Sequence, residues 1–399
     1  MTDIRVGRLR GIGAVLVVMV LWFWLMPLAS ASSVSIPTPT VQTMPIPAAP
    51  VLSAPAYLLI DYNSGQVLVE KNADEPMEPA SITKLVSTYV IFNALKNGDI
   101  RLDDQVLISE RAWRKGGSKM FIEVGDRVSV DNLLRGLIVQ SGNDATIALA
   151  EHVSGSVEAF VAEMNATAQR LGMHQSQFMN ATGWPAEGHV MSARDIAIIM
   201  AALIRDFPEY YVRYSEKEFT WNNIRQFNRN RLLWRDSSVD GGKTGHTSSA
   251  GYCLVASAVR DGTRLIAVVL GADSDAARTE QVQTLLNYGF RFFESVTVRR
   301  AGEVLAQPRV WKGEQREVAV GLREDLIVTI PRNQRDQLAI NLQLEPQLVA
   351  PIQPGQVVGQ VEVRLGDRVL LQREAIALQA VNEAGLIGRL IDSAWLWLQ

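Results

Sequence analysis

One short stretch, residues 79–85, constrains this chain more than any other. It reads Pro-Ala-Ser-Ile-Thr-Lys-Leu and places Ser81 three residues before Lys84 at the predicted start of a helix. Side chains three apart on a helix lie on one face, so we expect the lysine amine within hydrogen-bond reach of the serine hydroxyl. An unprotonated lysine is a base that can activate a serine as a nucleophile. None of the other seven lysines has a serine three residues before it.

Composition narrows the class of protein. A chain of 399 residues with 47% apolar and 20% charged residues is large enough for two or more globular domains. A formal net charge of −3 gives no bulk basic character, so no nucleic-acid partner is expected. A single cysteine, Cys253, excludes an internal disulfide and a multi-cysteine metal site. The histidines have no metal-ligand spacing, so a zinc enzyme is not expected; they are His152, His174, His189 and His246.

The first 54 residues are predicted to precede the folded part of the chain. Residues 1–31 have an arginine-rich start, an apolar run and then Ala29-Ser30-Ala31, which is typical of a signal peptide cleaved before Ser32. The alternative is a retained membrane helix, because the apolar run is nearly long enough to span a bilayer. Either way, the rest of the chain is expected outside the cytoplasm. Residues 32–54 are rich in Pro, Ser, Thr and Ala and predict an extended linker.

Ordered structure is predicted from about residue 55. Strands are expected over 56–61 and 66–70, and helices over 81–95, 132–139, 145–152, 196–204 and 276–293. The apolar runs 253–260 and 264–271, joined by Asp261-Gly262, predict an antiparallel hairpin. Residues 207–236 have no clear periodicity. From residue 295 to about 380, short runs rich in Val, Leu and Ile predict a small all-β domain that contains no candidate nucleophile.

Two more short motifs carry polar side chains. Ser141-Gly142-Asn143 falls at a turn between two predicted helices, where Ser141 and Asn143 can project into a cleft. Taken alone, a helix-capping turn explains this motif better. Lys243-Thr244-Gly245 comes just before the predicted hairpin. A Lys-Thr-Gly tripeptide is expected far less than once by chance in a chain of this size.

Taken in order, Ser-x-x-Lys, Ser-Gly-Asn and Lys-Thr-Gly resemble the three motifs of the penicillin-recognising serine acyl-enzymes. Within that group the chain is similar to low-molecular-mass penicillin-binding proteins, specifically serine-type D-alanyl-D-alanine carboxypeptidases with a C-terminal β-domain. The resemblance covers residues 55–399 and is most specific over 81–293. One departure is Gly242, where the family usually has a branched apolar residue, and we expect it to loosen a strand edge.

The resemblance implies a fold and a domain layout. The expected fold class is α/β (α+β), a penicillin-binding or β-lactamase-like transpeptidase fold with an antiparallel sheet flanked by helices. The catalytic domain is expected over residues 55–294, and the small all-β C-terminal domain over 295–380. No cofactor and no metal are expected.

The resemblance also implies a role for each residue of the first two motifs. Ser81 would attack the carbonyl of a terminal D-alanyl-D-alanine amide, and Lys84 would accept its proton. This requires the pKa of Lys84 to lie about three units below 10.4, which we expect from burial and from the charge of Lys243. Ser141 would relay the proton to the leaving amine. Asn143 would hold the substrate amide.

The remaining residues are expected to bind substrate. Lys243, Thr244 and Gly245 would lie at the strand edge beside the peptide. The backbone N–H groups of Ser81 and His246 map to the oxyanion hole of the family, so the role expected of His246 is one of its backbone and not of its ring. By resemblance alone, Arg278 helps bind the terminal carboxylate.

The expected activity is removal of the terminal D-alanine from peptidoglycan pentapeptides, with acylation by β-lactam antibiotics and a part in peptidoglycan maturation and cell shape. The expected location is the periplasmic face of the cytoplasmic membrane. Three alternatives stay open: a β-lactamase, a D,D-endopeptidase acting on cross-links, and a cell-wall-binding module without turnover. The β-lactamase is disfavoured because a secreted drug-hydrolysing enzyme has no evident use for the β-domain.

Residues 381–399 predict an amphipathic helix. At 100° per residue, one half of the wheel is almost entirely apolar and carries Trp395 and Trp397, whereas the other half is polar. The polar half argues against a spanning helix, and tryptophan suits a membrane interface. We therefore expect this segment to bind the inner-membrane surface. The alternative is that the apolar face packs on the protein itself or on a second copy.

Overall fold

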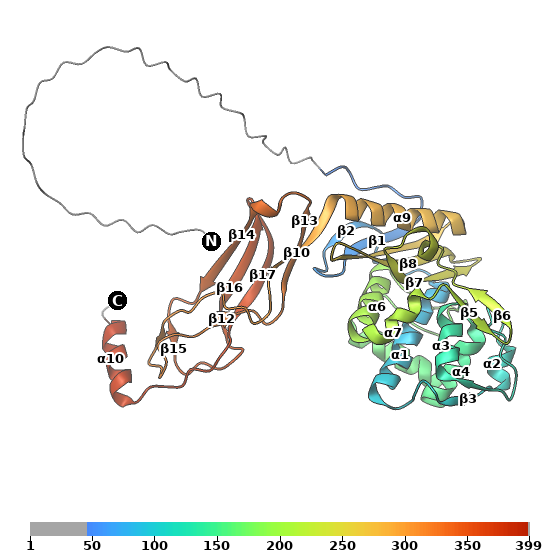
Figure 1. The fold of residues 1–399 in the computed structure, drawn as a ribbon, viewed down its shortest axis with the longest axis horizontal. Coiled ribbons are helices and arrows are strands. Elements are labelled where there is room, and N and C mark those ends of the chain that lie inside the picture. Colours follow the sequence, from blue (N-terminus) through green and yellow to red (C-terminus); the bar gives the residue numbers. More distant parts are fainter. Residues whose placement is uncertain (1–45, 398–399) are drawn as a thin grey trace, which may run out of the picture. The chain divides into compact units, whose positions relative to one another are not determined.

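The computed structural model describes residues 46–397, so the predicted signal peptide and most of the predicted linker lie outside the described residues. The first domain, which we define as residues 46–292, is built on an antiparallel sheet in the strand order β2-β1-β9-β8-β7 (Figure 1). Its strands are β1 (Ala56–Asp61), β2 (Val67–Lys71), β7 (Val239–Thr247), β8 (Gly251–Arg260) and β9 (Thr263–Ala272). The predicted hairpin forms the two innermost long strands, β8 and β9.

Helices cover both faces of this sheet. One face packs against α9 (Asp275–Phe292), and the other against a helical half that includes α1 and α6. The helices of that half, with a short 3₁₀ helix before the first, are η1 (Ala80–Thr83), α1 (Lys84–Asn97), α2 (Glu110–Arg114), α3 (Val130–Ile138), α4 (Asn143–Ser154), α5 (Val157–Arg170), α6 (Ala193–Asp206), α7 (Pro208–Tyr211) and η2 (Val212–Ser215). A further short helix, α8 (Leu232–Arg235), leads into β7.

The side chains of β9 explain why this sheet is covered on both sides. Successive residues of a strand point to opposite faces, and both faces of β9 are apolar. Leu265, Ala267 and Val269 belong to the core beneath α9. Ile266, Val268 and Leu270 belong to the core of the helical half.

Serine caps mark where five of the helices begin. Serine side chains accept a hydrogen bond from the backbone N–H three residues on at the start of α2, α3, α5, α6 and α9; the caps are Ser109, Ser129, Ser156, Ser192 and Ser274. Such a cap contributes about 1 kcal/mol. The region that lacked periodicity, 207–236, holds a hairpin of β5 (Glu218–Trp221) and β6 (Ile224–Phe227). A separate short antiparallel pair joins β3 (Gln105–Leu107) to β4 (Arg127–Ser129), with α2 between them in the chain.

The strand that carries Lys-Thr-Gly, β7, lies at the edge of the sheet. Its pairing with β8 shifts between Val239 and Gly241 and is then regular to its end, with Lys243 opposite Val255. Gly242 has φ +142°, and a Cβ there would lie 2.2 Å from the carbonyl oxygen of Val255. The expectation that Gly242 loosens the strand edge was therefore wrong, because this backbone position admits only glycine and the pairing continues through it.

The second domain, which we call the β-domain and define as residues 293–385, consists of strands and one 3₁₀ turn. Its main sheet has the order β12-β17-β16-β14, beside an antiparallel pair β10-β13 and a parallel pair β11-β15. The elements are β10 (Phe293–Arg299), β11 (Val310–Trp311), β12 (Val320–Gly321), β13 (Leu326–Pro331), η3 (Arg335–Gln337), β14 (Leu338–Leu344), β15 (Leu348–Val349), β16 (Val357–Leu365) and β17 (Arg368–Ala377). Aliphatic side chains fill its core.

The C-terminal helix, α10 (Leu386–Trp397), is shorter than predicted. Residues 381–385 are not helical, because Val381 is buried and pairs with Ile352 of the β-domain. The residues of α10 that are partly buried follow a helical spacing and are mostly polar: Gly388, Arg389, Asp392, Ser393 and Leu396. Asp392 accepts hydrogen bonds from the backbone N–H of Lys312 at 2.6 Å and from Arg309 at 3.4 Å.

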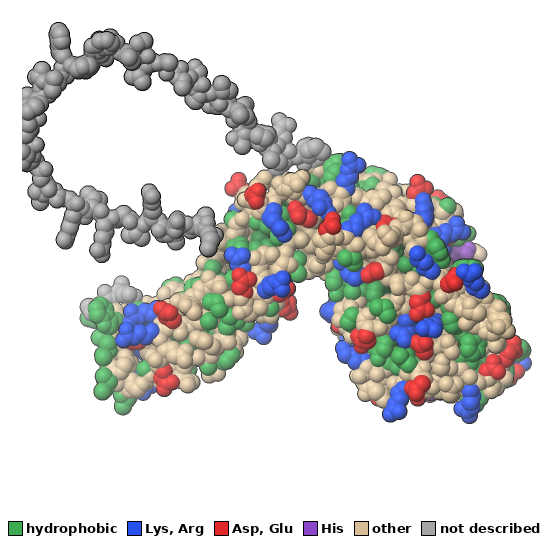
Figure 2. Space-filling model, in the orientation of Figure 1, with side chains coloured by type: hydrophobic (Ala, Val, Ile, Leu, Met, Phe, Trp, Pro, Cys, Tyr) green, Lys and Arg blue, Asp and Glu red, His purple; other side chains and the backbone are tan. Residues whose placement is uncertain are grey.

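The apolar face of α10 points away from the protein. Figure 2 shows hydrophobic side chains gathered along this helix, and its exposed large residues are Leu386, Ile387, Leu390, Ile391, Trp395 and Trp397. This exposure excludes the alternative in which the apolar face packs on the protein's own surface. Among residues 46–397, no helix combines the length and apolar character needed to cross a membrane.

Candidate active site

The candidate nucleophile lies on a tight turn and not on a regular helix. Ser81 belongs to η1, and α1 begins only at Lys84. Ala80, just before the serine, has φ +49°, a conformation that residues with a Cβ rarely adopt. The side chain of Thr83 donates a hydrogen bond to the carbonyl of Ala80 at 2.8 Å and closes the turn. Strain of this kind persists only where the surrounding structure holds it, and it is frequent at active sites.

The amine of Lys84 is placed to act as a base. Its Nζ lies 2.9 Å from Ser81 Oγ, 2.6 Å from Asn143 Oδ1 and 3.1 Å from the carbonyl oxygen of Thr182. Asn143 Nδ2 donates to the carbonyl of Gly116 at 2.7 Å, and this contact turns its Oδ1 toward the lysine. Because Oδ1 and the Thr182 carbonyl only accept, they take both hydrogens of a neutral amine. The lone pair of the nitrogen is then left for the hydroxyl proton of Ser81.

Burial favours the neutral form of this amine. Lys84 is fully buried, and this burial, together with the smaller effect of the positive charge of Arg229, lowers its pKa to about 7. The expected repulsion between Lys84 and Lys243 is present, because the charge of Lys84 lowers the pKa of Lys243, but the leading positive charge acting on Lys84 is Arg229, which was not expected. Asp144 acts in the opposite direction. A pKa near 7 leaves about half of the amine unprotonated at neutral pH.

Ser141 connects this lysine to a second one. Its Oγ lies 3.5 Å from Lys84 Nζ and 2.8 Å from Lys243 Nζ, and its own φ is +63°. Lys243 is 3% exposed, and its pKa is held well below the ordinary value by burial and then by the charge of Lys84. Two buried amines joined by a hydroxyl form a path along which a proton can move.

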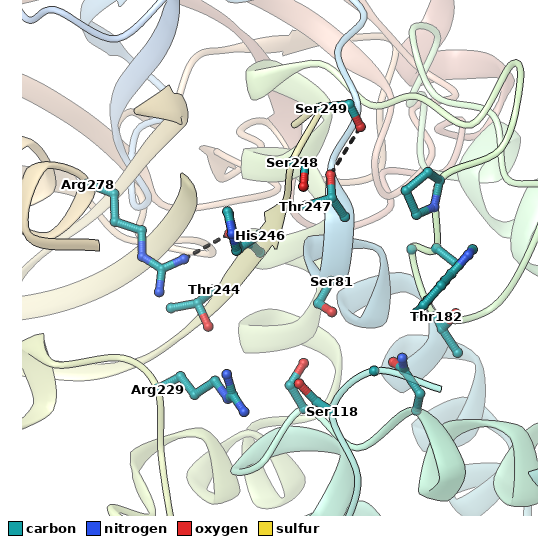
Figure 3. Close-up of a pocket in the computed structure, with 17 residues that line it drawn as sticks. Ser81, Ser118, Thr182, Arg229, Thr244, His246, Thr247, Ser248, Ser249 and Arg278 are labelled. Carbon is teal, nitrogen blue, oxygen red and sulfur yellow. Dashed lines mark hydrogen bonds between the residues drawn. The ribbon is translucent and has the colours of Figure 1, made fainter. Parts of the chain in front are cut away.

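The wall of the site opposite Asn143 is the edge strand β7. Thr244, Gly245 and His246 line a cavity of about 570 Å³ that opens at Ser81. Ser81, Ser118, Thr244 and Arg229 surround its open space in Figure 3. The ring of His246 stacks on Tyr252 with centroids 3.9 Å apart, and its Nδ1 bonds to the carbonyl of Gly251 at 3.0 Å. This agrees with a backbone role for His246.

Arg278 lies at the end of this wall with its donors already engaged. Its Nη1 donates to the carbonyls of Gly245 at 2.8 Å and Cys253 at 3.2 Å, and its Nε and Nη2 donate to Asp275 Oδ1. The side chain is 7% exposed. These bonds tie α9 to β7 and β8, so a contact with the substrate carboxylate stays a prediction.

Sequence reasoning missed several residues of the cavity. The most important is Arg229, which lines it and whose charge acts on both buried lysines. The others are Gly117, Ser118, Thr182, Gly183, Trp184, Pro185, Thr247, Ser248 and Ser249. All lie within residues 81–293, where the family resemblance is most specific, but no spacing between reactive groups distinguished them.

The structure brings together every residue of the three motifs, and their roles in the reaction stay predictions. Asp144, a buried carboxylate behind the site, is structural, since it accepts hydrogen bonds from the backbone N–H groups of Met120 and Phe121 at 3.0 Å each. Within residues 46–397 no group of three or more His, Cys, Asp or Glu is arranged to hold a metal ion.

Known proteins share this architecture. A family model described as D-alanyl-D-alanine carboxypeptidase matches residues 43–274, and one described as the C-terminal domain of penicillin-binding protein 5 matches residues 293–383. The D-alanyl-D-alanine carboxypeptidase DacC of Escherichia coli (strain K12) is 47% identical over 352 residues, which cover 86% of this chain and 88% of that protein. The DacA enzyme of the same strain is 44% identical over 360 residues, covering 88% of this chain and 89% of its own length.

Solved structures agree. Penicillin-binding protein 5 from Haemophilus influenzae superposes with a TM-score of 0.82 at 42% identity, covering 84% of this chain and 100% of that one. The whole-length likeness includes both domains, and the fold class expected from sequence is confirmed. The chain belongs to the D-alanyl-D-alanine carboxypeptidase family, and it is a serine-type peptidase that removes the terminal D-alanine from D-alanyl-D-alanine peptides.

Proposed function

We propose that Ser81, Lys84 and Ser141 carry out this reaction through an acyl-enzyme. The neutral amine of Lys84 takes the proton of the Ser81 hydroxyl while Oγ attacks the carbonyl carbon of the penultimate D-alanine. The carbonyl oxygen becomes an oxyanion held by the backbone N–H groups of Ser81 and His246, and removing one such donor usually costs about a hundredfold or more in rate. The observation that carries this proposal is the contact of Lys84 Nζ with Ser81 Oγ, with both amine hydrogens directed elsewhere.

The second half of acylation expels D-alanine. As the tetrahedral intermediate collapses, the carbon–nitrogen bond breaks and the leaving amine takes one proton. Ser141 Oγ donates it and is reprotonated from Lys84, which returns to the neutral state. Lys243, 2.8 Å from Ser141, keeps that hydroxyl oriented between the two amines. Water then hydrolyses the ester on Ser81 and frees the shortened peptide.

Arg229 is the cation that we assign to the carboxylate of the terminal D-alanine. It lines the cavity and, unlike Arg278, has no hydrogen bond or ion pair to another residue among those that the structure describes. Its charge lowers the pKa of Lys84, of Lys243 and of Arg278, so the cavity is a positive environment that suits a carboxylate. Arg278 then acts through the strand that it holds in place.

A labelled penicillin and a pentapeptide test the activity together. Penicillin-binding protein D2 of Listeria monocytogenes has been solved in an ampicillin-bound form and is 30% identical over 61% of this chain with a TM-score of 0.57, which supports acylation of this chain by β-lactams. The expected result is a covalent adduct with penicillin and release of D-alanine from the pentapeptide. Labelling without release of D-alanine indicates a binding protein. Fast loss of the label indicates a β-lactamase, and cleavage of cross-linked dimers an endopeptidase.

In the cell, this activity would act in peptidoglycan maturation and in the control of cell shape. The supporting argument is chemical: removing the terminal D-alanine destroys the donor that cross-linking reactions use. A deletion strain should accumulate pentapeptides in its wall, and only a Ser81-competent copy should restore their trimming. An unchanged muropeptide profile would contradict this role.

We also propose that α10 binds the outer surface of the cytoplasmic membrane. Its polar residues face the β-domain through Asp392, and its apolar face is exposed, with Ile387 77% and Trp397 89% accessible. A helix on a soluble surface turns its apolar face inward, so this orientation suits lipid. Insertion of apolar side chains should dominate over attraction to anionic lipid.

Binding to vesicles of phosphatidylethanolamine and phosphatidylglycerol tests this anchor. Residues 46–399 should sediment with the vesicles, and salt alone should not release them. A variant with Ile387, Leu390 and Trp395 changed to serine should stay in solution with unchanged penicillin labelling, whereas Arg389→Gln on the polar face should still bind. A full-length protein that stays a soluble monomer beside vesicles contradicts the anchor. A soluble dimer that the serine variant abolishes would favour the second copy as occupant.

A further inference from the structure

His189 lies directly behind the turn that carries the nucleophile. It is 2% exposed, and both ring nitrogens are hydrogen-bonded. The backbone N–H of Met179 donates to Nδ1 at 3.1 Å, so the proton of the neutral ring is on Nε2. Nε2 lies 2.8 Å from the hydroxyl oxygen of Thr83 and therefore donates to it. No motif of the sequence includes this histidine.

The hydrogen bonds continue into the strained turn. With its oxygen accepting from His189, the Thr83 hydroxyl has its own proton free to donate to the carbonyl of Ala80 at 2.8 Å. Ala80 is the residue with φ +49° that precedes Ser81. One chain of bonds thus runs from Met179 through His189 and Thr83 to the backbone beside the nucleophile.

The segment that ends at His189 also touches the site from the other side. Thr182 accepts a hydrogen bond from Lys84 Nζ at 3.1 Å. The next residue, Gly183, is so close to the turn that a Cβ there would lie 1.8 Å from the carbonyl oxygen of Ala80. The carbonyl of Ala80 is therefore enclosed between this loop and Thr83, so its direction determines that of Ser81.

We propose that His189 is a positioning residue that, acting through Thr83, fixes the turn bearing Ser81 in the orientation needed for acylation. This rests on the proposed role of Ser81 as the nucleophile. The ring can do this only as a single neutral tautomer, because protonation at Nδ1 would put two donors, that nitrogen and the Met179 N–H, against each other. Burial lowers the pKa of His189 to about 4, and the charge of Glu78 opposes this more weakly. The neutral ring therefore persists wherever the amine of Lys84 can act as a base.

Two conservative replacements separate the two hydrogen bonds of the ring. His189→Gln places an amide N–H where Nε2 was and keeps the donor to Thr83. His189→Asn places an amide oxygen where Nδ1 was and keeps only the acceptor for Met179. His189→Ala and Thr83→Val remove the link from either end. Leu286→Val, in the core on the opposite side of the sheet, controls for a general loss of stability.

The measurements are the second-order rate constant for acylation by a fluorescent penicillin, kcat and KM for a pentapeptide, and the melting temperature of each variant. A 1 Å displacement of a reacting group can cost about a hundredfold in rate, so His189→Ala and His189→Asn should acylate roughly 10–100-fold more slowly. His189→Gln should stay within about threefold of the unchanged protein. The loss should fall on kcat, with KM little changed, because the substrate wall is untouched.

The double variant, Thr83→Val with His189→Ala, should be acylated no more slowly than the slower of the two single variants. Both substitutions remove the same hydrogen bond, between His189 and Thr83. Acylation rates that follow melting temperature across all variants, Leu286→Val included, would overturn the proposal. So would equal rates for the Gln and Asn variants, or full additivity in the double variant. Failure of the unchanged protein to form any adduct would instead contradict Ser81 as nucleophile, so the two failures are distinguishable.

Discussion

The two domains are both built on antiparallel sheets with aliphatic cores, but they differ in what else they bury. Among the described residues, the β-domain buries one polar side chain, Thr329. The first domain buries a set of ionisable ones: Asp61, Lys84, Asp144, His189, Asp195, Lys243 and Arg278. Burial of a charged group is unfavourable unless it is paired or neutralised. The first domain therefore accepts a cost in stability that the β-domain avoids.

This difference in buried ionisable groups places the catalytic chemistry in the first domain. Three of these buried groups, Lys84, Lys243 and Arg278, are cations around one cavity, and their burial lowers the pKa of each. A base that is half unprotonated near pH 7 follows from that arrangement. The β-domain has no residue in the cavity, so its sequence is free to serve packing and the display of α10.

The largest effect expected is from the buried base. Lys84→Ala should slow acylation by penicillin about 10²–10⁴-fold, because the Ser81 hydroxyl loses its proton acceptor. Lys96→Ala, on the exposed end of the same helix, should acylate like the unchanged protein. Stopped-flow fluorescence with a labelled penicillin measures both. If folded Lys84→Ala protein is acylated at a near-normal rate, the buried lysine is not the base that activates Ser81.

The pH dependence of acylation tests the neutral amine itself. Since a proton on Lys84 blocks the reaction, the rate constant should rise about tenfold per pH unit below pH 7 and flatten above it. Circular dichroism at each pH controls for unfolding. A rate constant that is flat from pH 5 to pH 9 would exclude lysine as the base.

Replacing Arg229 should have an intermediate effect on activity, and it should change both kcat/KM for the peptide and the pH dependence of acylation. Arg229→Leu removes a charged hydrogen bond to the substrate carboxylate and should lower kcat/KM for the pentapeptide roughly 10–100-fold. It also removes a positive charge near Lys84, so the midpoint of the acylation profile should move to higher pH. Arg231→Leu, an exposed arginine paired with Asp275, is the matched control. A midpoint unchanged by Arg229→Leu would contradict the electrostatic part of the account.

The smallest effect on chemistry is expected from the β-domain core. Val361→Ala on β16, at a fully buried position, should cost about 1–3 kcal/mol of that domain's stability. Its acylation rate should not change, because the cavity lies wholly in the first domain. Differential scanning calorimetry and penicillin labelling give the two readouts. Slower acylation by this variant would show that the two regions are coupled.

Local patterns predicted those parts of the site that local geometry determines. The spacing of Ser81 and Lys84 within one turn fixes their contact, even though the turn is a 3₁₀ helix with α1 starting at Lys84. The two apolar runs joined by Asp261-Gly262 predicted the β8–β9 hairpin, and burial was correctly expected as a cause of the lowered pKa of Lys84. The hairpin of β5 and β6 was missed, although Asn222-Asn223, both at positive φ, is a turn signal.

Contacts between residues that are far apart in the chain could not be predicted from the sequence. Arg229 lies within residues 207–236, which have no clear periodicity, and it reaches the cavity from the segment between β6 and α8. His189 and Thr83 are 106 residues apart, and no period links them. The start of α10 was placed five residues early because Val381 continues the apolar pattern while its backbone pairs with Ile352. In each case, partners distant in sequence decided the outcome.

The central claim is that Ser81, activated by Lys84, forms the acyl-enzyme. Peptide mapping by mass spectrometry after a short incubation with penicillin tests it most directly. The account predicts one adduct, on the peptide that contains Ser81, absent from Ser81→Ala protein that is otherwise folded. An adduct on another residue, or a covalent adduct that persists in Ser81→Ala, would contradict it.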